Sequence, residues 1–194
     1  MSRALAAVAI LALSVAPAIA ETFVGPSNSF TLEFDGDWSV IQAQNRGGVV
    51  CTETACGKDR VACLVLPRSD EAAKPGKPLP DMLVDRFGDR LVSMPPAGMK
   101  SEYVEKFAAR TIGDVSGSWA EIRSSGEKPS VHFGLFLFAA PGFDIALSCG
   151  SPEGSWPAHK ARIEKLLGSV KLGAVSEAPP AVGPQIPGAQ LQPR

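Results

Sequence analysis

The longest apolar pattern in the chain runs from Ser130 to Cys149 and consists of two runs of strand length joined by Ala-Ala-Pro-Gly. In the first run both alternating faces are apolar, with Val131 and Phe133 on one face and Phe136 and Phe138 on the other. A strand of this kind is normally covered on both faces. The pattern therefore predicts a β-hairpin at the centre of a sheet, which is a core and not a site.

Shorter segments that alternate polar and apolar residues predict strands around this hairpin. The predicted strands are Ser29–Phe34, Trp38–Ala43, the two arms of a hairpin between Gly48 and Leu66, Lys100–Ala108 and Gly117–Ser124. Asp35-Gly36-Asp37 has the composition of a hairpin turn, and Gly57 marks the turn of the second hairpin. With its turn centred at Gly57, the second hairpin would place Cys51 opposite Cys63.

Apolar residues at spacings of three and four predict an amphipathic helix over Leu79–Met94. Its buried stripe would consist of Leu79, Met82, Leu83, Phe87, Leu91 and Met94. The opposite side carries an acidic row, Asp81, Asp85 and Asp89, beside Arg86 and Arg90. Such a row could receive a cation or a basic partner, but mixed charge of this kind is typical of a solvated face, which is the interpretation we favour.

The last periodic segment predicts a helix from about Ser155 to Val170. Ser155 can cap it, Pro157 suits its first turn, and Lys165 and Lys171 suit the negative end of its dipole. With about eight strands that meet mainly as antiparallel hairpins and two amphipathic helices, the fold class is α+β.

The first 20 residues, Met1–Ala20, predict a signal peptide. Arg3 is followed by an apolar run that closes in Ala18-Ile19-Ala20, the small-x-small pattern of a cleavage site. The run is too short for a membrane span, and no later segment reaches the roughly 20 apolar residues that a bilayer requires. We therefore expect a periplasmic or secreted protein that begins at Glu21 and has no transmembrane segment in its mature form.

Composition divides the remaining chain into one domain and a tail. Residues 21–172 are long enough to bury a core, whereas Gly173–Arg194 is rich in Pro, Gly, Ala and Gln and predicts a disordered tail. Without Arg3 the charged residues are 18 basic and 20 acidic, a net charge of −2. A surface this close to neutral gives no reason to expect nucleic acid as a partner.

Four cysteines in an exported chain predict disulfides, with three possible connectivities. The register of the second hairpin favours Cys51–Cys63, which leaves Cys56 to meet Cys149. The rival set, Cys51–Cys56 with Cys63–Cys149, is nearly as plausible. No Cys-x-x-Cys pair points to a metal, a haem or a redox site, and no glycine-rich loop points to a nucleotide, so we expect no metal and no cofactor.

Candidate catalytic residues are few, because the chain has only two histidines. His132 is interpreted as a hydrogen-bonded or edge-exposed residue of the central strand, and His159 as an exposed residue of the last helix. No Gly-x-Ser-x-Gly elbow is present, and a hydrolase would need either histidine beside a serine and an acid. Trp38, Trp119 and Trp156 could stack on a ligand, but their positions favour packing.

Element order and several short motifs together resemble the PsbP/Mog1-like α/β/α sandwich proteins. The motifs are F-T-L-E-F-D-G-D-W in the first hairpin, G-D-V-S-G-S-W-A-E-I before the central hairpin and L-L-G-S-V-K-L at the end of the last helix. Asp37-Trp38 and Leu167-Gly168-Ser169-Val170 carry the likeness best, and it covers roughly Ser27 to Leu172. The resemblance implies an antiparallel sheet flanked by helices and a non-catalytic accessory or protein-binding role.

Three functional hypotheses follow, and we rank them in this order. The first is an exported, non-enzymatic accessory or interaction protein whose partner is another exported or envelope protein. The second is a small-ligand binder with a pocket between the sheet and the Leu79–Met94 helix. The third is a hydrolase that uses His132 or His159.

Overall fold

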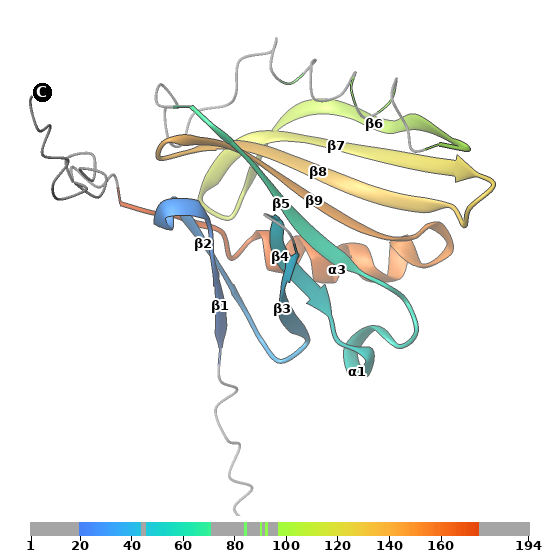
Figure 1. Ribbon diagram of the computed structural model, residues 1–194, viewed down its shortest axis with the longest axis horizontal. Coiled ribbons are helices and arrows are strands. Elements are labelled where there is room, and N and C mark those ends of the chain that lie inside the picture. The colour runs from blue at the N-terminus through green and yellow to red at the C-terminus, as the bar shows by residue number, and fades with distance from the viewer. Residues whose placement is uncertain are drawn as a thin grey trace, which may run out of the picture.

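The computed structural model describes residues 20–43, 46–70, 84, 90, 92 and 97–174. These residues form two antiparallel sheets and a helix that packs between them (Figure 1). The small sheet has the strand order β1-β2-β10, with bounds Glu21–Val24, Phe30–Phe34 and Lys171–Leu172. The fold class α+β is confirmed, and β1 and β10 are strands that the sequence pattern did not predict.

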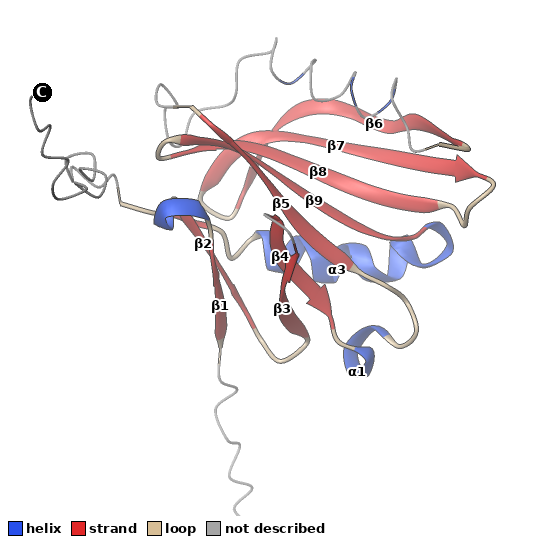
Figure 2. Cartoon of the chain, viewed as in Figure 1, coloured by secondary structure: helices blue, strands red, loops and turns tan. Residues whose placement is uncertain are grey.

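The large sheet has seven strands in the order β3-β4-β5-β9-β8-β7-β6. Their bounds are Trp38–Ala43 for β3, Arg46–Cys51 for β4, Ala62–Ser69 for β5, Met99–Ile112 for β6, Val115–Gly126 for β7, Val131–Ala140 for β8 and Phe143–Pro152 for β9. The predicted central hairpin is β8–β9, and β9 is the middle strand. Figure 2 shows how strongly this sheet curves.

Two helices can be bounded in the described chain, α1 (Glu53–Cys56) and α3 (Trp156–Leu167), and short 3-10 turns lie at Pro26–Asn28 and Glu153–Ser155. α3 packs against β9 and β2, and its apolar residues Ile163, Leu166 and Leu167 are buried. No helix in the described part of the chain is long and apolar enough to cross a bilayer.

Both faces of β8 are covered, as its sequence predicts. Phe136 and Phe138 belong to the main core, which also contains Phe30 of β2 and Ile163 and Leu167 of α3. Leu135 and Leu137 belong to a second cluster on the opposite face of the sheet. The sheet is therefore an interior layer, and this fixes its register because a slip of one residue would exchange the two faces.

Val84 is helical and buried, and it belongs to the second hydrophobic cluster. Of the predicted helix Leu79–Met94, the structure describes only Val84, Arg90 and Val92, all three helical. The predicted stripe omitted Val84. The acidic row, the stripe residues and a pocket against this helix lie outside the described residues, as do Met1–Ile19 and the tail from Val175.

The favoured disulfide pairing is wrong, and the structure has the rival set: Cys51–Cys56 and Cys63–Cys149. In the register of β4 and β5, Cys63 lies opposite Val49 and not opposite Cys51. The connection is not a symmetric turn at Gly57, because α1 turns Cys56 back beside Cys51 before the chain extends into β5. Cys63 then faces Cys149 directly across β5 and β9.

At Gly134 the backbone of β8 closely approaches the indole ring of Trp119. A Cβ at this position would lie 2.1 Å from the ring of Trp119 on β7, so only glycine leaves room for the indole. Trp119 is almost completely buried, which confirms the prediction that it packs in the core.

Candidate functional site

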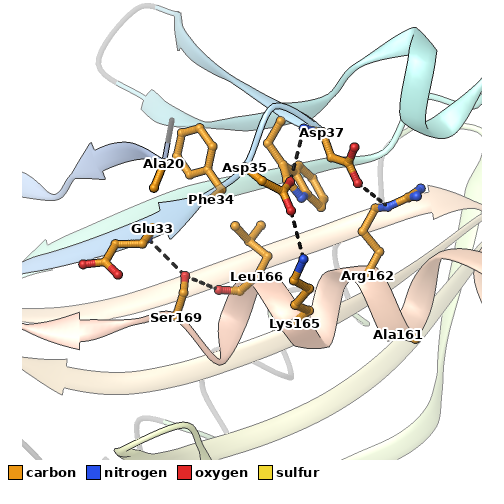
Figure 3. A pocket seen from close by; sticks show the side chains of 11 residues that line it. Ala20, Glu33, Phe34, Asp35, Asp37, Ala161, Arg162, Lys165, Leu166 and Ser169 are labelled. Atoms are coloured by element: carbon orange, nitrogen blue, oxygen red, sulfur yellow. Dashed lines mark hydrogen bonds and ion pairs between the residues drawn. The ribbon is translucent and has the colours of Figure 1, made fainter. Parts of the chain in front are cut away.

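The structure holds an open groove between the β2–β3 turn and α3 (Figure 3), with a volume of about 570 Å³. Its floor is apolar and consists of the buried side chains of Phe34, Trp38 and Leu166. Ala20, the last residue of the predicted signal peptide, also lines it. The volume falls within the range of small-molecule and peptide-anchor sites.

The two walls of the groove carry opposite charge. Asp35 and Asp37 come from the β2–β3 turn, while Arg162 and Lys165 come from α3. Lys165 Nζ donates to Asp35 Oδ2 at 2.9 Å, and Arg162 Nε lies 3.4 Å from Asp37 Oδ2. The bond from Lys165 lowers the pKa of Asp35, and the same bond raises the pKa of Lys165. Both ion pairs are accessible to solvent, so each contributes little to the free energy of folding.

Hydrogen bonds from the segment that follows α3 to β2 fix one end of the groove. Ser169 Oγ accepts the backbone N–H of Glu33 at 3.1 Å and donates to the carbonyl of Leu166 at 2.7 Å. Lys171 Nζ reaches Glu33 Oε1 at 2.7 Å. The groove is therefore set by the docking of α3 on the small sheet and does not depend on a long loop.

A second polar feature lies beneath α3, where Glu121 of β7 accepts three hydrogen bonds. Its Oε2 is 3.0 Å from His132 Nε2 and 3.2 Å from Trp156 Nε1, and its Oε1 accepts from Lys160 Nζ at 2.5 Å. The His132 ring stacks on the Trp156 indole, with centroids 4.4 Å apart. We call Glu121, His132, Trp156 and Lys160 the buried polar cluster.

Electrostatics explain why the Glu121 carboxylate can be buried. Desolvation by itself would raise its pKa, but the bonds and charges of Lys160 and His132 outweigh that effect, so the pKa is lowered. The cluster thus holds an ionised carboxylate that accepts three hydrogen bonds. This arrangement ties α3 to the sheet.

The sequence-based prediction is confirmed for one histidine and wrong for the other. His132 is hydrogen-bonded, as predicted. The prediction that His159 is exposed is wrong: only 7% of the residue is accessible, because α1 and the loop after it pack over α3. His159 Nε2 lies 2.9 Å from Asp59 Oδ2, and His159 Nδ1 faces Cys56 Sγ. Within the described residues no hydrogen bond joins either histidine directly to a serine hydroxyl; Ser155 and His159 instead share the carboxylate of Asp59.

A buried carboxylate on the sheet gives a pH-dependent prediction. Asp144 of β9 is 1% exposed, and desolvation and the neighbouring Asp70 raise its pKa above 3.8, with Arg68 partly offsetting them. A raised pKa means that this residue favours the folded state at low pH and opposes it once the pH rises past the folded pKa. Asp144→Asn should therefore raise the free energy of unfolding at pH 7 by about 1 kcal/mol.

Urea unfolding of the wild type and Asp144→Asn at pH 7 and near pH 4 checks this prediction. The stabilisation should shrink at the lower pH. Asp114→Asn, at an exposed position, is the matched control and should change neither value. A variant that is equally stabilised at both pH values would contradict the assigned cause.

Most residues of the groove were not singled out by sequence reasoning. Lys165 was interpreted only through the helix dipole and Asp35 only as a turn residue, whereas Asp37 was a turn residue and part of the Asp37-Trp38 motif. The contacts between them span 130 residues, and only the fold brings them together. The sequence signal that could have found them is the concentration of basic residues on one side of the last helix.

Comparison by sequence gives no relative: no known protein family matches the chain, and no curated protein does. Comparison of structures gives a clear result. The solution structure of cyanobacterial PsbP (CyanoP) from Synechocystis sp. PCC 6803 aligns with a TM-score of 0.58 at 10% identity, over 82% of this chain and 95% of that one. The chain has the PsbP-like fold.

Two further structures align with the chain. A crystal structure from Bacteroides thetaiotaomicron VPI-5482 gives a TM-score of 0.52 at 12% identity over 78% of this chain, which spans 47% of that protein. The Ran-binding protein Mog1p of Saccharomyces cerevisiae gives a TM-score of 0.48 at 10% identity, over 80% of this chain and 96% of that one. The predicted PsbP/Mog1-like fold is confirmed by the alignment with cyanobacterial PsbP, and an identity this low speaks for fold alone.

Proposed function

We propose that the protein is an exported, non-enzymatic interaction module that uses the groove between the β2–β3 turn and α3 to bind a segment of another exported or envelope protein. The observation that carries this proposal is the groove itself, which combines an apolar floor with walls of opposite charge. Interfaces that bind a short segment typically join an apolar anchor pocket to a polar rim.

Export is supported by two independent features. Met1–Ala20 has the pattern of a cleavable signal peptide. The structure pairs all four cysteines in disulfides, which persist mainly in oxidising compartments. A periplasmic or secreted location fits both features.

The charged walls suit a partner segment that carries both signs of charge. The Asp35–Lys165 pair is exposed, so a partner can replace it with its own ion pairs at little cost. The apolar floor then supplies the affinity through burial of one or two anchor side chains.

Processing would open this site. Ala20 lines the groove, and β1 begins at the next residue, Glu21. Cleavage after Ala20 removes that part of the lining and leaves the new α-ammonium group of Glu21 at the start of β1. In this proposal the mature protein is the form that binds.

Site-specific photo-crosslinking in the native host tests the proposal. A photoreactive residue at position 165, in the groove, should give an adduct with a discrete protein mass. The same residue at position 128, in the exposed loop between β7 and β8, is the matched control and should give none. Charge reversal by Asp35→Lys should abolish the adduct at position 165. Equal adducts at both positions, or none at position 165, would refute a groove-bound partner.

A small-ligand binder is the second candidate, favoured by the volume of the same groove. The mature protein purified from its own compartment distinguishes the two candidates. A native mass that exceeds the denatured mass by less than about 1 kDa indicates a small ligand, whereas an increment of polypeptide size indicates a protein partner.

A further inference from the structure

The two disulfides lie in different chemical surroundings. Cys56 Sγ accepts a hydrogen bond from Arg162 Nη1 at 3.3 Å and lies 3.7 Å from His159 Nδ1. Cys63 and Cys149 are 1% and 0% exposed between two central strands, and no charged side chain of the described chain is hydrogen-bonded to either sulfur. Of the two disulfides, only Cys51–Cys56 therefore has a guanidinium and an imidazole beside one of its sulfurs.

Both groups that face Cys56 are held in place by other partners. His159 Nε2 lies 2.9 Å from Asp59 Oδ2, so the imidazole is oriented between a carboxylate and the sulfur. Arg162 donates to the carbonyl of Ala55 at 2.6 Å and pairs with Asp37. The ionisable side chains facing Cys56 are thus Arg162 and His159 from α3, backed by Asp59 and Asp37 from two other segments.

Such surroundings favour a thiolate over a thiol at Cys56. A guanidinium and an imidazole within hydrogen-bonding reach stabilise a sulfur anion, whereas an ordinary cysteine is mostly protonated at neutral pH. In thiol–disulfide exchange the sulfur that better carries negative charge is the faster leaving group. An attacking thiolate is therefore directed to Cys51, with Cys56 as the leaving group.

From this geometry we propose that Cys51–Cys56 is a thiol–disulfide exchange site that reacts with a dithiol. One thiolate of the dithiol attacks Cys51 Sγ, the Cys51–Cys56 bond breaks, and its electron pair goes to Cys56 as a thiolate beside Arg162 and His159. The second thiol of the dithiol then attacks the mixed disulfide and releases Cys51, which takes up a proton. The dithiol becomes a disulfide, and this protein gains two electrons.

The local structure gives this bond a way to open alone. α1 is a single turn of four residues, and Figure 1 shows it at the outer end of β4, away from the central strands. Glu53, Thr54, Gly57 and Lys58 around it are exposed, while Cys51 and Cys56 are 7% and 6% exposed. Opening this one turn uncovers Cys51 without separating β5 from β9.

Graded reduction of the oxidised mature protein is the first test. The protein is treated at pH 7 without denaturant with increasing dithiothreitol, quenched with acid, alkylated and mapped by peptide mass. Cys51–Cys56 should open at a dithiothreitol concentration at least tenfold lower than Cys63–Cys149, with the circular dichroism spectrum of the folded chain retained. Opening of both bonds together, or of Cys63–Cys149 first, would overturn the proposal.

Alkylation of the selectively reduced protein is the second test, and it isolates the role of α3. At pH 6 iodoacetamide should modify Cys56 at least tenfold faster than Cys51. Arg162→Gln should slow the Cys56 reaction about tenfold, the value expected for loss of a hydrogen bond to a charged group. Lys106→Gln, which removes an exposed lysine of β6 outside the groove, is the control and should leave the rate unchanged. Equal rates for the two cysteines, or a rate that Arg162→Gln does not alter, would refute thiolate stabilisation by α3.

Discussion

Replacing Cys63 and Cys149 together by alanine should lower the free energy of unfolding by about 4.5 kcal/mol, one of the two largest effects that we expect. This disulfide joins residues 86 apart in sequence and connects the neighbouring strands β5 and β9. Closing a long loop restricts the unfolded chain most, and the stabilisation is lost when the bond is removed. Urea unfolding under non-reducing conditions measures the change.

The matched control is the double variant Cys51→Ala/Cys56→Ala. That disulfide closes a segment of only five residues in sequence separation, so its removal should cost about 2 kcal/mol. The order of the two losses in stability is what tests the role of loop closure. If the Cys51–Cys56 variant lost as much stability as the Cys63–Cys149 variant, loop closure would not be the source of the stabilisation.

Replacing Glu121 by alanine should lower the free energy of unfolding at pH 7 by about 3 kcal/mol. Glu121 is 4% exposed and accepts bonds from His132, Trp156 and Lys160, so its removal leaves the buried donors of two rings without an acceptor. The cluster also links β7 and β8 to α3, and we therefore expect the contact between the helix and the sheet to weaken. Chemical denaturation followed by tryptophan fluorescence measures the loss.

The pH dependence of this loss follows from the sign of the pKa shift. The pKa of Glu121 is lowered from 4.5, so its contribution is present above that value and disappears as the pH falls through the folded pKa. The difference in stability between wild type and Glu121→Ala should therefore shrink as the pH falls below 4.5 and through the lowered pKa of folded Glu121. Glu105→Ala, at an exposed position opposite Glu121 on β6, should change stability by less than about 0.5 kcal/mol across this pH range. A difference that stays unchanged as the pH falls until Glu121 of the folded protein is protonated would contradict the charge-based account.

Much of the sheet could be predicted from the sequence because its side chains obey a local period. Phe136 and Phe138 face α3 while Leu135 and Leu137 face the other way, and this alternation is readable without any partner. The last helix was predictable for the same reason. β1 was missed because a four-residue edge strand is too short to show a period.

The pairing of the cysteines and the groove could not be read in this way. The single helical turn α1 shifts the register of β4 and β5 by two residues from the predicted one. A turn of that length is too short to show a periodic pattern in the sequence. The groove depends on contacts such as Asp35 with Lys165, whose positions are related only through the packing of α3 on the small sheet. The periodicity of the sequence indicates which residues of a strand or helix are buried. It does not indicate which elements pack together, and the groove depends on that packing.

The most direct test of the account as a whole is the intact mass of the protein recovered outside the cytoplasm of a host that expresses the full chain. The account predicts a chain that begins at Glu21 and whose non-reduced mass is lower than its reduced mass by the four hydrogens of two disulfides. A chain recovered only inside the cytoplasm, still carrying Met1–Ala20 and four free thiols, would contradict the claim that this is an exported, disulfide-bonded interaction module.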